Sequence, residues 1–220
     1  MSVQLPPARS VVQNPTQAEM RDWVLELMPK GRTTVTEFGN INYTARILAR
    51  LTPSTFVVSD EPNVKKTISR EEAAAYAAQQ DAHIAEQDMI LIEGYIGPDP
   101  AFRTASRLYM EKAHANIPAM QQQLFFPKDE AWEPHFTVIY TPTLRIPEHH
   151  EECLILVDYD TWTTRVFGSD YFGESKMGGL RMWNLLVYQQ GGLAMHCGAK
   201  TFPAEETADG TEHLALIIGL

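Results

Sequence analysis

Residues 171–179 read YFGESKMGG, and residues 194–197, after a helical stretch, read AMHC. The first stretch is a glycine-rich turn that carries a phenol, a carboxylate and an ammonium group. Glycine lets a backbone approach a ligand closely, lysine neutralises phosphate or carboxylate charge, and histidine can bind a divalent metal. Each feature alone also fits a simpler structure, because such a turn can merely begin a helix and a lone histidine in an apolar strand is commonly a core residue.

Helical and extended patterns alternate along the rest of the chain. Capping boxes at Thr16–Glu19 and Ser69–Glu72 begin two helices, the second of which reaches about Gln87, and a third helix follows Gly179. We predict strands at residues 55–58, 89–93, 136–140, 153–158, 193–197 and 214–218. Alternation of this kind predicts a mixed α/β sheet.

Two segments carry more specific expectations. Residues 103–116 are expected to be helical, with Arg103 and Arg107 at i,i+4 spacing and paired with surface carboxylates such as Glu111. Residues 214–218, LALII, are apolar throughout, which is typical of a strand covered on both faces. A buried strand so near the last residue suggests that part of the fold lies beyond this chain.

Composition and charge exclude several classes of protein. The 220 residues are 44% hydrophobic and 21% charged, which suits a folded domain rather than a disordered chain. The net charge of −10 and the lack of a dense Lys/Arg stripe argue against a nucleic-acid partner, and no apolar run is long enough to cross a membrane. Cys153 and Cys197 are expected to be reduced, and we expect a cytoplasmic protein.

The segment Asp170–Ala199 resembles the ATP-dependent phosphoenolpyruvate carboxykinase family. In that family a Tyr-x-Gly-Glu-x-Lys-Lys-Gly segment precedes a helix containing Met and Asn, and Met-His-Cys follows on a strand. The matching residues here are Tyr171, Gly173, Glu174, Lys176, Gly178, Met182, Asn184, Met195, His196 and Cys197.

Earlier and later segments resemble the family in the same order. Ile92–Pro100 with the two arginines that follow resembles the family's strand-turn-arginine region, and Ala49–Pro53 is similar to its Gly-Arg-Ser-Pro segment. His213–Leu220 resembles the strand that leads into the family's phosphate-binding loop, of which Gly219 and Leu220 are the first two residues. The resemblance covers most of the chain after about Thr33 and is most specific from Asp170 onward.

The resemblance implies a mixed-sheet amino-terminal domain of the phosphoenolpyruvate carboxykinase fold over residues 16–220. Residues 1–15 are polar and interrupted by prolines, so we expect a mobile lead-in there. The family converts oxaloacetate and ATP to phosphoenolpyruvate, carbon dioxide and ADP, using magnesium-ATP and a second ion, usually manganese. By position, Arg50 binds a substrate carboxylate, Tyr171 lies beside the departing carbon dioxide, Lys176 adds positive charge, and His196 is a manganese ligand. Oxaloacetate or phosphoenolpyruvate and the missing carboxy-terminal, nucleotide-binding half are the implied partners.

Two departures from the family limit the implied activity. The second lysine of the family's Lys-Lys pair is a metal ligand, and Met177 occupies that position with a soft thioether that suits manganese poorly. The lysine, hydroxyl and aspartate that would complete the phosphate and metal sites lie beyond Leu220. We therefore expect this chain alone to be inactive, and the alternative is a non-catalytic regulatory or binding module that keeps the carboxykinase fold.

Overall fold

The computed structural model describes residues 3–61 and 66–218, which fold as a mixed α/β protein, as the sequence predicts. The chain divides into two compact units, one up to Met182 and one from Trp183 onward. The prediction of a single domain over residues 16–220 stays a prediction.

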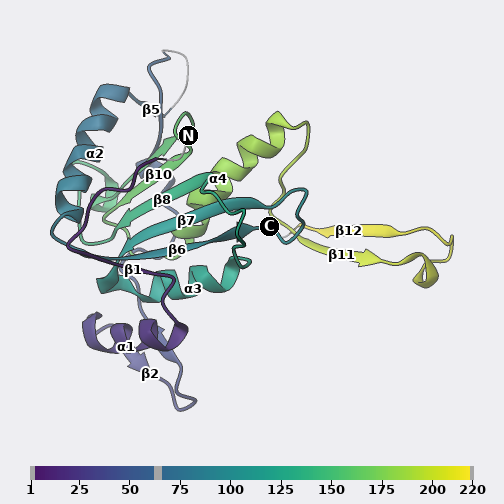
Figure 1. Ribbon diagram of the computed structural model, residues 1–220, viewed down its shortest axis with the longest axis horizontal. Helices are drawn as coiled ribbons and strands as arrows, with labels where there is room; N and C mark the ends of the chain where they lie inside the picture. The colour runs from purple at the N-terminus through teal and green to yellow at the C-terminus, as the bar shows by residue number, and fades with distance from the viewer. Residues whose placement is uncertain (1–2, 62–65, 219–220) are drawn as a thin grey trace. The chain divides into compact units, whose positions relative to one another are not determined.

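The first unit contains a mixed sheet in the order β1-β6-β7-β8-β10-β9-β4-β5 (Figure 1). Its strands within the described residues are β1 (Ser10–Gln13), β4 (Thr55–Val58), β5 (Thr67–Ile68), β6 (Asp88–Ile96), β7 (Thr104–Glu111), β8 (Phe136–Thr141), β9 (Leu154–Asp158) and β10 (Thr163–Phe167). The neighbours β7, β8 and β10 run parallel, whereas β6 is antiparallel to β7 and β9 is antiparallel to β10. The carboxyl ends of three adjacent strands, β7, β8 and β10, therefore lie on the same side of the sheet.

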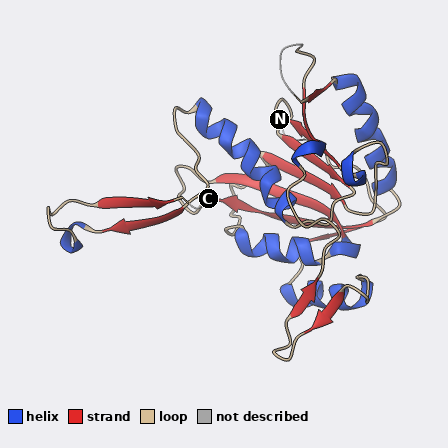
Figure 2. Cartoon of the chain, turned by 180° about the vertical axis from the view of Figure 1, so that it is seen from behind, coloured by secondary structure: helices blue, strands red, loops and turns tan. Residues whose placement is uncertain are grey.

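Helices cover both faces of this sheet. Helix α2 (Arg70–Ile84) packs on one face, where the amide of Gln80 donates to Thr141 Oγ1 and to the Val166 carbonyl. Helices α3 (Asn116–Leu124) and α4 (Gly173–Gln189) lie on the other face, and the view from behind shows α4 crossing it (Figure 2). The contact is close, because a Cβ on Gly178 would lie 2.6 Å from Val138 Cγ2 on β8.

The remaining elements of the first unit lie beside the sheet or connect its strands. They are α1 (Gln17–Leu27), the hairpin β2 (Thr33–Val35) and β3 (Ile41–Tyr43), and the short 3-10 turns η1 (Thr52–Ser54), η2 (Lys112–His114) and η3 (His150–Glu152). The capping box at Thr16–Glu19 is confirmed, since Thr16 Oγ1 accepts from the Glu19 N–H and the Glu19 carboxylate accepts from the Thr16 N–H.

The helix predicted over residues 103–116 is wrong, because Thr104–Glu111 is strand β7 in the middle of the sheet, buried along its whole length. Arg107 is buried and donates to Thr137 Oγ1 on β8, and Arg103 pairs with Asp129. Glu111 is paired with His83 instead of an arginine. Pairing with two neighbouring strands outweighs the helical spacing of the two arginines.

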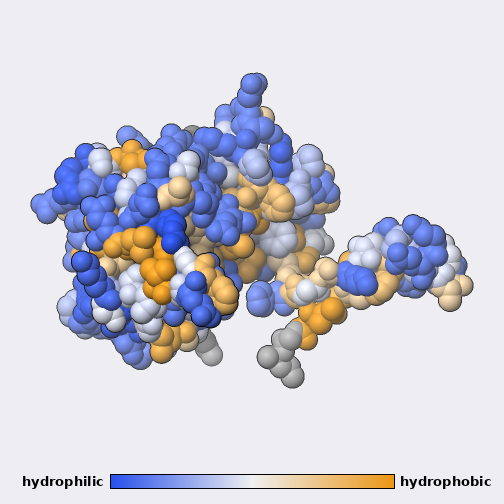
Figure 3. All heavy atoms as spheres, turned by 90° about the horizontal axis from the view of Figure 1, so that it is seen from below, coloured by the Kyte–Doolittle hydropathy of each residue, from blue (hydrophilic) through white to orange (hydrophobic). Residues whose placement is uncertain are grey.

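The second unit corrects one strand prediction and the expected burial of another. Leu193–Cys197 is not a strand, and the nearby strand β11 begins later, at Gly198–Phe202. It pairs antiparallel with β12 (His213–Ile217), and the 3-10 turn η4 (Ala204–Glu206) lies between them. Strand β12 was predicted correctly, but the expected burial on both faces is wrong, since Leu214 is 64% and Ile217 65% exposed. Apolar surface is visible along this hairpin in Figure 3.

The segment expected to be a lead-in contributes to the sheet. Ser10–Gln13 forms β1, parallel to β6 at the sheet edge, and Leu5 packs against the cluster around Ile84 and Tyr109. Among the residues that the structure describes, no helix is long and apolar enough to cross a membrane.

Candidate functional site

The first turn of α4 is hydrogen-bonded to a segment more than 120 residues earlier in the chain. The wholly buried carboxylate of Glu174 accepts from the Leu51 N–H, with an N···O distance of 3.4 Å. Leu51 directly follows Arg50, and Glu174 lies between Tyr171 and Lys176. This hydrogen bond therefore joins the two segments that carry three of the predicted site residues.

Asp170 makes a second connection between the same two segments. Its carboxylate accepts from the backbone N–H groups of Arg46 (2.7 Å) and Ile47 (2.9 Å) and from the Tyr43 hydroxyl (2.8 Å). Burial raises the pKa of Asp170, but these hydrogen bonds outweigh it and hold the pKa below its ordinary value. Asp170 and Glu174 together hold the Tyr43–Leu51 segment against the turn that contains Tyr171.

Arg50 is exposed, and within the described residues its guanidinium has no carboxylate partner. A guanidinium without a carboxylate partner can bind a substrate carboxylate through two parallel hydrogen bonds. Lys176 is also exposed on the first turns of α4, with its Nζ 6.0 Å from the centre of the Phe172 ring. The cationic groups of Arg50 and Lys176 therefore lie on two segments that are hydrogen-bonded to each other.

Tyr171 is half-buried and lies directly against the helix. Its carbonyl accepts from the Tyr140 hydroxyl at 2.9 Å. A Cβ added to Gly173 would lie 2.3 Å from Tyr171 Cε1, so the position of this ring requires glycine there. The glycine of the motif thus serves the placement of the phenol.

The predicted metal ligand, His196, belongs to the second unit. His196 is exposed in the second unit, between α4 and β11, rather than in a core strand, and Gly219 and Leu220 lie outside the described residues. Within residues 3–61 and 66–218 no three His, Cys, Asp or Glu side chains are grouped so that they could hold a metal ion. With the soft thioether of Met177 on α4, the described residues do not fit a manganese site by themselves.

A buried ion pair between Arg181 and Glu174 supports this arrangement, and it was not predicted from the sequence. Arg181 Nη2 lies 2.7 Å from Glu174 Oε2, and the two side chains are 7% and 0% exposed. The signal was present as two opposite charges seven residues apart, which fall on the same face of an α-helix. Arg181 neutralises the carboxylate that holds Leu51, so it supports the segment of Arg50 indirectly.

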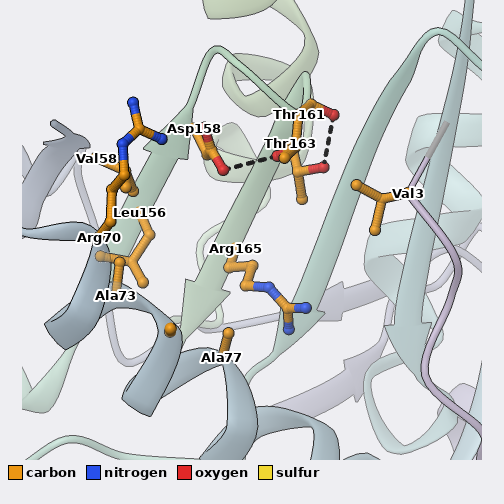
Figure 4. Close-up of a pocket in the computed structure, with 11 residues that line it drawn as sticks. Val3, Val58, Arg70, Ala73, Ala77, Leu156, Asp158, Thr161, Thr163 and Arg165 are labelled. Atoms are coloured by element: carbon orange, nitrogen blue, oxygen red, sulfur yellow. Dashed lines mark hydrogen bonds between the residues drawn. The ribbon is translucent and has the colours of Figure 1, made fainter. Parts of the chain in front are cut away.

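A pocket of about 310 Å³ lies between α2 and strands β4, β9 and β10 (Figure 4). Alanines of α2, including Ala73 and Ala77, line it together with Leu156. Its two arginines already have carboxylate partners, since Arg165 pairs with Asp81 and Arg70 with Asp160. No predicted site residue lines this pocket.

The sequence pattern that defines the phosphoenolpyruvate carboxykinase family matches residues 9–220. "Phosphoenolpyruvate carboxykinase (ATP) 1" of Moorella thermoacetica is 35% identical over 58% of this chain and 25% of its own length. "Phosphoenolpyruvate carboxykinase (ATP) 2" of the same organism is 31% identical over 71% of this chain and 32% of its own length.

"Phosphoenolpyruvate carboxykinase (ATP)" of Caldanaerobacter subterraneus subsp. tengcongensis is 29% identical over 76% of this chain. The match covers 34% of the length of this third relative. Across the three relatives the matched share is 25–34%, so the chain spans about a quarter to a third of their length. The chain belongs to the ATP-dependent phosphoenolpyruvate carboxykinase family and matches the amino-terminal part of its relatives.

Proposed function

We propose that this chain is the amino-terminal, substrate-binding lobe of an ATP-dependent phosphoenolpyruvate carboxykinase, an enzyme of gluconeogenesis. In the reaction the bond between carbon 3 of oxaloacetate and its carboxylate breaks, and carbon dioxide leaves. The electron pair left behind forms an enolate, whose oxygen attacks the γ-phosphorus of ATP to give phosphoenolpyruvate and ADP. The protein must hold the substrate carboxylate and stabilise the negative enolate.

One observation carries this proposal: the hydrogen bond between Glu174 and the Leu51 N–H, which joins the segment of Arg50 to the turn of Tyr171 and Lys176. Family membership makes the ATP-dependent reaction the expected one. The unpaired fork of Arg50 suits the carboxylate that remains on the product. Lys176 would add charge beside the substrate, and Tyr171 would lie beside the departing carbon dioxide.

Manganese and magnesium-ATP are expected in the full-length family, where they would stabilise the enolate and the transferred phosphoryl group. The described residues do not fit a manganese site, so we assign no step of this lobe to a metal. We propose that His196 contributes one ligand and that the other ligands come from outside the described residues. Gly219 and Leu220 stay predicted to begin the phosphate-binding loop.

A carboxy-terminal, nucleotide-binding half is the expected partner of this lobe. The relatives are about three to four times longer than the part that this chain matches. The exposed apolar residues of β12, among them Leu214, Leu216 and Ile217, are suited to packing against further polypeptide. A cytoplasmic location stays a prediction from the sequence.

A second function has one observation in its favour. Met177 occupies the position of a family metal ligand on α4, and the described residues contain no alternative metal cluster. A regulatory or binding module could keep the carboxylate site of Arg50 without any catalysis. Such a protein would bind phosphoenolpyruvate but would stay inactive even when joined to a nucleotide-binding half.

The proposal is tested by activity and by binding. The 220-residue chain with oxaloacetate, magnesium-ATP and manganese should form no phosphoenolpyruvate above the background rate. It should bind phosphoenolpyruvate weakly, with Kd on the order of millimolar by calorimetry, and Arg50→Gln should weaken binding roughly tenfold. Arg21→Gln, at an exposed position of α1, is the matched control and should bind like the wild type. Clear ATP-dependent turnover, or unchanged binding in Arg50→Gln, would contradict the proposed role.

A further inference from the structure

A second pocket lies at the carboxyl ends of the three parallel strands β7, β8 and β10. A pocket of about 320 Å³ is lined by His114 just after β7, by Thr143 and Arg145 just after β8, and by Gly168 and Asp170 just after β10. In open α/β sheets, ligands bind preferentially in crevices outside the carboxyl ends of parallel strands. The volume suits a small metabolite.

Three arginines reach this pocket in a chain whose net charge is −10. Arg46 donates to the carbonyls of Glu151 (3.0 Å) and Gly168 (2.5 Å), so its hydrogen bonds go to neutral acceptors and fix the side chain in place. Arg32 is 44% exposed and forms a long ion pair with Asp170, in which Nη1 lies 3.9 Å from Oδ2, beyond hydrogen-bond distance. Neither guanidinium is hydrogen-bonded to a carboxylate within the described residues.

The acidic groups at and around the pocket already accept hydrogen bonds from other groups. Both oxygens of Asp170 accept from backbone N–H groups and the Tyr43 hydroxyl. Glu111 is held by His83 and by Thr143. Glu152 pairs with Arg145, which leaves Arg32 and Arg46 as the cations that face the pocket without a hydrogen-bonded acid.

We propose that this pocket binds a small anion, a carboxylate or a phosphate group, through the guanidinium groups of Arg32 and Arg46. A planar guanidinium matches either group with two parallel hydrogen bonds. The site does not depend on the proposed carboxykinase function. Tyr43 and Arg46 line it from the segment that continues to Arg50, so the two sites share one stretch of chain while using different arginines.

The test titrates the chain with inorganic phosphate and, separately, with succinate, and follows binding by calorimetry. Arg32→Gln is the diagnostic variant, because Arg32 is exposed and its loss leaves the buried contacts of Arg46 in place. We expect saturable binding of at least one anion, weakened roughly tenfold in Arg32→Gln and unchanged in Arg21→Gln. Tighter binding of succinate assigns a carboxylate ligand, and tighter binding of phosphate assigns a phosphorylated one.

Two results would overturn the proposal: equal affinity of Arg32→Gln and wild type, or no saturable binding of either anion. The variant Arg50→Gln separates this site from the proposed substrate site. If Arg50→Gln removes the binding and Arg32→Gln does not, the anions occupy the substrate site and the second site does not exist. If Arg32→Gln removes anion binding and Arg50→Gln does not, the second site is supported independently of the proposed carboxykinase function.

Discussion

Removing the positive charge of Arg181 should destabilise the protein strongly. The change Arg181→Met keeps a long apolar side chain but leaves the carboxylate of Glu174 buried without its partner at 2.7 Å. Breaking a buried pair in this way costs about 3–5 kcal/mol. Arg181 Nε and Nη1 are themselves buried without a hydrogen-bond partner, so their removal offsets part of the loss. We expect a net loss of about 3 kcal/mol.

The double variant Glu174→Gln/Arg181→Met isolates the charge interaction. Glutamine keeps an oxygen to accept from the Leu51 N–H, and no buried charge remains. We expect this variant to be within about 1–2 kcal/mol of the wild type, which gives a coupling energy of about 4–5 kcal/mol when each single change costs about 3. Unfolding in urea, followed by circular dichroism, measures all four proteins.

An exposed ion pair provides the control. Arg70 and Asp160 are 2.5 Å apart, but their side chains are 51% and 65% exposed, so Arg70→Met should change stability little. The reasoning fails if Arg181→Met is as mild as Arg70→Met, or if the double variant loses the sum of the two single changes. Either result would mean that the Glu174 carboxylate does not depend on Arg181.

Two further predictions concern packing and pH. Gly178→Ala should destabilise by about 1–2 kcal/mol in thermal unfolding, because the new Cβ meets stiff Val138 at 2.6 Å, and this outweighs the gain in helix propensity. Gly179→Ala, whose nearest neighbour is the flexible end of Ile96 at 3.0 Å, should cost less, and the opposite order would contradict the packing described. Burial lowers the pKa of His114 below 6.5, so the unfolded chain binds the proton first and stability should fall as the pH drops below about 6.5. His114→Gln should reduce that loss in urea midpoints measured between about pH 8 and 5, whereas an unchanged slope would exclude this histidine as its source.

Local patterns predicted those elements whose stabilising contacts lie within the element or in a clear apolar run. The capping box at Thr16–Glu19 and the strands near residues 55, 136 and 154 are examples. Strand β7 was missed because its side chains include Arg107, whose guanidinium donates to Thr137 on β8 and to the Val3 carbonyl. Such contacts between distant segments leave no periodic signal in one sequence.

The candidate site was predicted by resemblance rather than by spacing. Arg50, Tyr171 and Lys176 lie on two segments that the hydrogen bond of Glu174 to the Leu51 N–H joins, and their roles stay predictions. The role of the Asp170 and Glu174 carboxylates in joining the segments was not predicted, because their backbone partners in the Arg46–Leu51 segment are over 120 residues away. The exposure of β12 was also unforeseen, because an apolar run does not reveal what covers it.

The most direct test of the proposed substrate lobe is a two-dimensional NMR titration of the 220-residue chain with phosphoenolpyruvate. The account predicts that the largest amide shift changes occur at Arg50, Tyr171 and Lys176. These changes should disappear in Arg50→Gln and persist in Arg32→Gln. Shift changes that avoid these residues, or that remain unaltered in Arg50→Gln, would contradict the claim that Arg50 and the turn before α4 form one substrate site.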